Sequence, residues 1–248
     1  MKDIYNHIDN NVEEYVSDLQ ELIRIPSVSA QNIGLEECAE FVKKQMHKDG
    51  LPAELHEIPG GPPLVFGHLK SSLSKKTLFC YSHYDVQPPE PIEKWSHGGP
   101  WSGALVDDVI YGRGATDNKG GLLAFNKAAK AFLEVRGEVP LNLKFFYEGE
   151  EEIGSVHLGP WVEKNKKLLE ADGMHCLDGT VDTFAKVPEV ELGLKSVLFI
   201  ELIARGGKKD IHSLNFPLVP SPPWELVHAL STIMTRDRKI LIKDWYDG

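Results

Sequence analysis

Histidine and carboxylate side chains in this sequence stand where apolar runs end. His83 and Asp85 follow the run at 77–82, and Asp178 follows the run at 174–177. Imidazole nitrogens and carboxylate oxygens bind Zn²⁺ at about 2.0–2.2 Å. Two metal ions about 3.5–4 Å apart can share a bridging carboxylate and a bridging water, which a nearby general base deprotonates. A metal-assisted hydrolytic site is therefore predicted from His83, Asp85, Asp117, Glu151, Glu152 and Asp178.

The spacing of His83 and Asp85 favours a metal ligand beside its supporting residue. Side chains two residues apart on an extended segment point to the same side. His83 can bind a metal ion through one ring nitrogen while Asp85 fixes the other, as is usual around a metal-bound histidine. A His-x-Asp pair alone is more often structural, so this prediction depends on the rest of the set.

Asp117 lies in a glycine-rich segment, Gly-Arg-Gly-Ala-Thr-Asp-Asn-Lys-Gly-Gly at 112–121. The glycines permit a tight backbone path, and Asp117 is placed just before a predicted helix. The segment lacks the GK[ST] ending of a P-loop and does not match GxGxxG, so phosphate binding is not predicted.

The acidic run Glu150-Glu151-Glu152 follows another predicted strand and leads into Ile153-Gly154-Ser155. Like charges this close together are costly unless cations or solvent offset them. An acidic triplet alone is usually a solvated surface, whereas its position at a strand end favours a bound cation.

Helices must alternate with strands to place these residues. Helical periodicity predicts helices over 3–24, 35–49, 118–135 and 155–169. Apolar runs predict strands over 53–58, 63–69, 77–82, 141–147 and 174–177, with a long loop at 85–114. This alternation indicates an α/β fold with a doubly wound, mostly parallel sheet, in which ligands bind beyond the carboxyl ends of the strands.

The regular alternation of predicted strands and helices stops after about residue 190. Residues 1–190 are predicted to form the catalytic metal-binding domain, without its C-terminal part. A strand at 197–204, a loop at 205–223 and a helix at 224–236 indicate that 191–248 begins a smaller α+β domain.

Composition narrows the class of protein. The 248 residues carry a formal net charge of −10 and no basic stripe, so a nucleic-acid partner is not expected. The three cysteines are odd in number, widely spaced and form no CxxC motif, so a disulfide framework is not expected and a reducing cytoplasm fits best. The N-terminus does not read as a secretory signal, and no apolar run is long enough to span a membrane, so no membrane partner is expected.

In combination, the motifs resemble the co-catalytic two-zinc metallopeptidase family that includes aminoacylases, glutamate carboxypeptidases, acetylornithine deacetylase and carnosinases. The sequence Asp85-Val86-Gln87-Pro88, with Trp95 and Trp101 after it, is most similar to the carnosinase and cytosolic nonspecific dipeptidase branch. The matching stretches are 25–29, 82–88, 112–120, 148–155 and 210–213.

The resemblance implies the metal ligands. His83 and Asp178 would bind one zinc ion, Glu152 would bind the other, and Asp117 would bridge both. Manganese or cobalt could replace zinc at a site rich in carboxylates.

The resemblance also implies the catalytic residues. Glu151 would be the general base that deprotonates a water bridging the two zinc ions, and Asp85 would orient His83. His212 would stabilise the oxyanion at the substrate carbonyl, although here Leu214 and its neighbours replace the glycines that follow this histidine in many relatives. Substrates would be small peptides with a free carboxylate, and the smaller domain would serve as a lid and form a homodimer.

The last metal ligand of the family is a histidine near the C-terminus of a longer chain, and 239–248 read as sequence within a domain. The predicted function is metal-dependent hydrolysis of dipeptides or related small peptides. An N-acyl amino acid deacylase or a carboxypeptidase of the same family is the first alternative. The second is a short, catalytically impaired form that acts as a metal-binding module.

Overall fold

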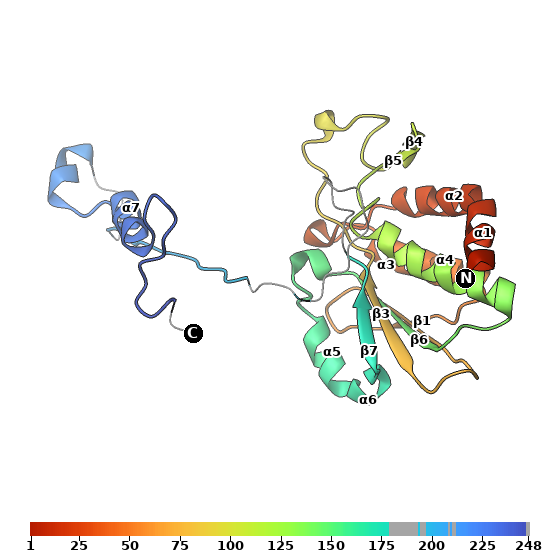
Figure 1. Ribbon diagram of the computed structural model, residues 1–248. Helices are drawn as coiled ribbons and strands as arrows, with labels where there is room; N and C mark the ends of the chain where they lie inside the picture. The colour runs from red at the N-terminus through yellow and green to blue at the C-terminus, as the bar shows by residue number, and fades with distance from the viewer. Residues whose placement is uncertain (179–192, 194–196, 208, 210–211, 247–248) are drawn as a thin grey trace. The chain divides into compact units, whose positions relative to one another are not determined.

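The computed structural model describes residues 1–178, 193, 197–207, 209 and 212–246 (Figure 1). The chain divides into two units, residues 1–190 and 191–248. The predicted domain boundary at 190/191 lies outside the described residues. Each unit is described by itself below.

The first unit is built on a five-stranded sheet with the spatial order β1–β2–β6–β3–β7. Its strands are β1 (Glu54–His56), β2 (Leu64–Leu69), β3 (Thr77–His83), β6 (Asn142–Glu148) and β7 (Gly173–Cys176). β6, β3 and β7 pair in parallel, whereas β2 runs antiparallel to both of its neighbours. Since β2 alone is reversed in this sheet, the prediction of a mostly parallel α/β sheet is confirmed.

Both faces of the sheet are buried by helices. On β2, Val65 joins a core with α2 (Val12–Ile23), α3 (Leu35–Lys48) and α4 (Lys119–Arg136). Its neighbour Phe66 joins a second core with Trp161 of α5 (Leu158–Lys164). Figure 1 shows these helices on opposite sides of the strands. Successive residues of a strand point to opposite faces, so this alternation produces the doubly wound arrangement.

Two helices that were predicted to be continuous are each divided at an asparagine. The predicted helix at 3–24 is α1 (Lys2–Asn10) followed by α2, and the predicted helix at 155–169 is α5 followed by α6 (Lys166–Leu169). The side-chain amide of Asn11 donates to the carbonyl of His7 at 2.7 Å. That of Asn165 donates to the carbonyl of Trp161 at 2.8 Å. Such bonds compete with the helical backbone pattern, and apolar periodicity does not reveal them.

The long loop predicted at 85–114 contains a small hairpin. β4 (Ala104–Val106) and β5 (Val109–Tyr111) pair antiparallel, and a short 3₁₀ turn, η2, spans Ile92–Lys94. The two turn residues, Asp107 and Asp108, have φ angles of 49° and 62°. A two-residue hairpin turn with both φ angles positive usually carries Asn-Gly or Asp-Gly, so Asp-Asp was a weak signal.

The second unit does not contain the strand predicted at 197–204. The described residues 197–207 have no regular secondary structure, and Phe199 is 93% exposed. A strand needs a partner for its backbone hydrogen bonds, and no described segment pairs with this one. The predicted helix is present as α7 (Pro222–Ile233), with proline at its first turn, after the 3₁₀ turn η4 (Ser213–Leu218). The lid and dimerisation role of this unit stays a prediction.

Candidate metal centre

His83 ends β3 and is completely buried. Its Nδ1 lies 3.0 Å from the backbone carbonyl of Asp85 and 3.3 Å from the Asp85 carboxylate. If Nδ1 carries the proton, it donates toward Asp85 and leaves Nε2 with a free lone pair. Nε2 is buried and makes no hydrogen bond of acceptable geometry. A buried ring nitrogen without a partner is costly, so this atom is suited to a ligand.

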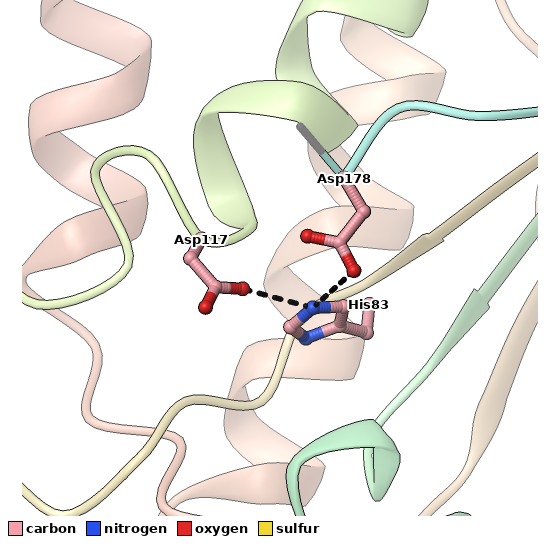
Figure 2. Close-up of side chains that lie close together, drawn as sticks. All are labelled: His83, Asp117 and Asp178. Carbon is pink, nitrogen blue, oxygen red and sulfur yellow. Dashed lines mark ion pairs between the residues drawn. The ribbon is translucent and has the colours of Figure 1, made fainter. Parts of the chain in front are cut away.

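Carboxylates surround that nitrogen. The distance from His83 Nε2 to an oxygen of Asp117 is 3.1 Å, to Asp178 3.6 Å and to Glu151 3.9 Å. Figure 2 shows Asp117 and Asp178 approaching the imidazole ring from two different segments. His83, Asp117 and Asp178 each offer one ligand atom, and these atoms lie within 4.8 Å of one another. The structure thus brings together three of the four predicted metal ligands.

Close backbone packing produces this convergence. Asp117 precedes α4, and Asp178 follows β7. A side chain at Gly121, in the first turn of α4, would place its Cβ 2.3 Å from the backbone oxygen of Leu177. Glycine at 121 therefore lets the start of α4 approach the end of β7, and this approach sets Asp178 beside Asp117.

A buried lysine anchors the same segment. The ammonium of Lys119 donates to the carbonyls of Leu22 at 3.1 Å and Ile25 at 2.6 Å, at the end of α2. Burial lowers the pKa of Lys119. These bonds tie the glycine-rich segment, which includes Asp117, to the end of α2 and so restrict the movement of Asp117.

Asp85 connects the histidine to the acidic turn η3 (Glu151–Ile153). Its carboxylate is buried and accepts the backbone N–H groups of Glu151 at 3.2 Å and Glu152 at 3.1 Å. The predicted role of Asp85 was to orient His83 through its side chain. In the structure the shorter contact to the ring comes from the backbone carbonyl of Asp85, and the carboxylate holds the acidic turn.

Glu152, the fourth predicted ligand, lies outside the cluster of three. Its carboxylate accepts a hydrogen bond of 2.9 Å from the side-chain amide of Gln87, which also donates to the Glu152 carbonyl at 3.0 Å. Sequence reasoning assigned no role to Gln87. A signal was present, because Gln87 follows Asp85 by two residues and shares its side of an extended segment.

Carboxylates outnumber the single imidazole at this centre. Burial lowers the pKa of His83, but the carboxylates of Asp117, Asp178 and Asp85 outweigh burial and raise the pKa to about 12. Burial also raises the pKa of Glu151 and that of Glu152, and the neighbouring carboxylates raise both further. A bound divalent cation would offset the repulsion among these carboxylates and favour their ionised forms. The buried Nε2 of His83, surrounded by carboxylate oxygens, fits a metal ion that accepts nitrogen and oxygen ligands.

His212 belongs to the second unit and is exposed. Its Nδ1 accepts a hydrogen bond of 3.1 Å from the backbone N–H of Leu214. Asp210 and Ile211, from the same motif, lie outside the described residues. The oxyanion role of His212 stays a prediction.

Known proteins resemble this chain in sequence and in fold. Cys-Gly metallodipeptidase dug1 of Schizosaccharomyces pombe is 34% identical over 256 aligned positions, which cover 96% of this chain and 53% of that protein. Beta-Ala-His dipeptidase of Homo sapiens is 29% identical over 264 positions, covering 100% of this chain and 52% of that protein. Among solved structures, the M20 family metallo-carboxypeptidase Sso-CP2 from Sulfolobus solfataricus has a TM-score of 0.81 and 37% identity, covering 94% of this chain and 53% of that one. Human carnosine dipeptidase 1 has a TM-score of 0.75 and 28% identity, covering 99% and 55%.

The chain spans about half the length of the curated relatives it matches. The model of Peptidase family M20/M25/M40 matches residues 79–236, which include every residue of the candidate centre described above. The motifs that suggested a two-metal peptidase, the mixed sheet that carries them and these relatives agree, and the chain belongs to Peptidase family M20/M25/M40.

Proposed function

We propose that this chain carries the metal centre of a cytoplasmic enzyme that hydrolyses dipeptides or related small peptides with two Zn²⁺ ions. The observation that carries the proposal is the buried, unpartnered Nε2 of His83 with three carboxylates within 3.9 Å. The names of the relatives, a Cys-Gly metallodipeptidase and a Beta-Ala-His dipeptidase, support the dipeptide substrate.

The family resemblance assigns the ligands, and the short distances among His83, Asp117 and Asp178 support three of them. His83 and Asp178 would hold one ion, Glu152 would hold the other, and Asp117 would contribute to both. Mn²⁺ or Co²⁺ also suits such a donor set.

Bound ions would lower the pKa of a water molecule and polarise the scissile carbonyl. Glu151, whose carboxylate lies 3.9 Å from Nε2 of His83, would take the proton from that water and deliver it to the leaving amine. Burial raises the pKa of this carboxyl, which strengthens it as the base that accepts the proton. Asp85 keeps Glu151 in place through the turn of the backbone, and His212 stabilises the oxyanion.

The remaining assignments complete the proposal. The substrate is a small peptide with a free carboxylate, and residues 191–248 contribute to a lid through which two copies associate. None of the helices in the described part of the chain is both long and apolar enough to cross a membrane.

A carboxypeptidase is the second candidate. The specific observation in its favour is the TM-score of 0.81 with the metallo-carboxypeptidase Sso-CP2 at 37% identity. The two candidates differ in the substrate they accept, since a carboxypeptidase also removes the last residue of longer peptides.

The test measures metal per chain by elemental analysis, together with hydrolysis of free dipeptides, longer peptides and N-acetyl amino acids. Two ions per chain with cleavage of dipeptides alone supports the proposal, and cleavage of longer peptides supports the carboxypeptidase. Bound metal without hydrolysis indicates a metal-binding module. A chain that binds no metal at saturating Zn²⁺, Mn²⁺ and Co²⁺ contradicts the proposal.

A further inference from the structure

A carboxylate outside the proposed ligand set lies beneath the acidic turn. Glu148 is the last residue of β6 and is 4% exposed. Its Oε1 accepts two hydrogen bonds, from the hydroxyl of Tyr81 on β3 at 2.7 Å and from the hydroxyl of Ser155 at 2.8 Å. Two hydroxyl donors on one buried oxygen form a polar network with a defined geometry.

Glu148 and Ser155 are the two ends of the loop that carries Glu151 and Glu152. Within this loop Ser155 N–H donates to the Glu150 carbonyl at 2.8 Å, and Gly154 N–H donates to the Glu151 carbonyl at 2.8 Å. The loop is therefore closed on itself, and the bond between Glu148 and Ser155 joins its exit to its entry.

The entry is held by close packing as well. A Cβ at Gly149 would lie 2.4 Å from the hydroxyl oxygen of Tyr84, so the chain leaves β6 directly against the Tyr84 ring. The backbone N–H of Tyr84 donates to the Glu148 carbonyl at 2.9 Å. Because Glu148 is opposite His83 in the parallel register, its position is fixed relative to that ligand.

Two buried carboxylates thus hold the loop from two sides. Asp85 accepts the N–H groups of Glu151 and Glu152 at the turn. Glu148, where the loop begins, accepts the hydroxyl hydrogen bonds of Tyr81 on β3 and of Ser155, where the loop ends.

We propose that Glu148 is a positioning residue, which holds the base Glu151 and the ligand Glu152 toward His83 by accepting the hydroxyl hydrogen bonds of Tyr81 and Ser155. The proposal rests on the proposed function for the roles of Glu151 and Glu152. Accepting hydrogen bonds is the essential property, so a glutamine at 148, which keeps one acceptor oxygen in place, retains it. A leucine leaves both hydroxyl groups without their acceptor.

The first measurement is amide hydrogen exchange of residues 149–155 in the metal-free protein. In Glu148→Leu we expect exchange at Glu151 and Glu152 to be at least about tenfold faster than in the wild type, because an opening cost near 1.4 kcal/mol corresponds to a factor of ten. Glu148→Gln should stay close to the wild type. Because this experiment contains no metal, it judges the positioning role separately from the proposed function.

The second measurement is metal affinity by competition with a chelator. Residues that support metal ligands typically change affinity by about 10–100-fold. We expect this loss for the more weakly bound ion in Glu148→Leu and Tyr81→Phe, and little change for the ion at His83 and Asp178. Tyr147→Phe is the matched control. Tyr147 lies next to Glu148 on β6 and donates a buried hydroxyl hydrogen bond to Asn126 at 2.8 Å, but it faces the core formed with α2, α3 and α4, away from the acidic turn.

Unchanged loop exchange in a folded Glu148→Leu protein overturns the proposal, as does a Glu148→Gln protein that matches Glu148→Leu. If Glu148→Leu does not fold, Ser155→Ala and Tyr81→Phe decide, because each removes one donor alone, and unchanged loop exchange in both overturns the proposal. A wild-type chain that binds no metal contradicts the proposed function, while the exchange data still test Glu148.

Discussion

Two groups of side chains in the first unit could each offer three ligand atoms to a cation, but the charges around them differ. His83, Asp117 and Asp178 offer ligand atoms within 4.8 Å at the strand ends, and Glu14, Asp18 and Asp49 do so between α2, α3 and α4. The second group, here called the helix cluster, has its own cations. Lys127 bonds Asp18 and, at 2.7 Å, Asp49, while Lys130 bonds Glu14 and Lys48 bonds Asp18.

The difference separates a structural charge network from a metal centre. In the helix cluster each carboxylate contacts an ammonium group supplied by the chain. At the strand ends, the one basic group within 4.0 Å of Asp117 and Asp178 among the described residues is the imidazole of His83. Proximity of carboxylates alone therefore does not identify a metal site. The absence of a nearby lysine, together with a histidine nitrogen that makes no hydrogen bond, distinguishes the proposed metal centre from the helix cluster.

The largest expected effect comes from Asp117→Asn, which keeps the size of the side chain and removes its charge. Because Asp117 is proposed to bridge both ions, bound metal should fall to near zero at equimolar Zn²⁺, as elemental analysis after gel filtration measures. Asp18→Asn in the helix cluster is the control, and it should leave metal content unchanged. Equal metal content in Asp117→Asn and the wild type would contradict the ligand assignment.

Lys127→Met tests the structural role of the helix cluster. It leaves Asp18 and Asp49, whose side chains are 4% and 0% exposed, without their shared ammonium. Breaking a buried pair in this way costs about 3–5 kcal/mol. Urea denaturation should show this loss, while the folded variant should bind metal as the wild type does. A loss below about 1 kcal/mol, as for a surface pair, would show that the network contributes little.

Asp85→Ala is expected to have a smaller effect on the metal centre. It removes the acceptor for the N–H groups of Glu151 and Glu152. Metal affinity should fall by about 10–100-fold, the range for groups that support ligands, and chelator competition measures it.

Asp172→Ala is the matched control for that variant. Asp172 accepts the N–H of Thr77 at 2.9 Å at the opposite end of β3. Its loss removes the same kind of bond far from the ligands, so an equal drop in affinity in both variants would refute the specific role of Asp85.

The smallest expected effect is a pH dependence within the helix cluster. Burial raises the pKa of Asp18, but Lys127 and Lys48 outweigh it and hold the pKa below its ordinary value. The stabilisation from Asp18 is therefore present above its unfolded pKa of about 3.9 and is lost as pH falls through the lower folded pKa. Burial raises the pKa of Asp49 despite Lys127, so its contribution has the opposite sign and declines as pH rises.

Urea midpoints between about pH 3 and pH 7 test these signs. Asp18→Asn should reduce the loss of stability in acid, and Asp49→Asn should increase it. If both substitutions change the loss of stability in acid in the same direction, the pKa values of Asp18 and Asp49 are not shifted in opposite directions.

Many of the helices, strands and site residues of this protein could be predicted from local sequence patterns. Helical periodicity located most helices and apolar runs located the five strands of the main sheet, because the residues that bury a helix face or a whole strand lie close together in the sequence. The alternation of these elements predicted where the strand ends meet. The types of His83, Asp117, Glu151 and Asp178 then indicated a cation, since only a few side chains bind metal ions.

Other features depended on contacts between distant segments. The breaks at Asn11 and Asn165 arose from side-chain bonds that compete with the helix. The apolar run at 197–204 read as a strand, yet no described segment pairs with it. Local periodicity carries no information about either kind of partner.

Only the tertiary structure distinguished the acidic residues by role. Asp18, Asp49 and Glu148 are as acidic in the sequence as Asp117, but two of them contact lysine and one contacts hydroxyl groups. Lys127 lies 109 residues from Asp18, and Tyr81 lies 67 residues from Glu148 along the chain. The physical reason is that a carboxylate's role is set by the charge and donors around it, and close packing, such as that of Gly121 against Leu177, decides which groups those are.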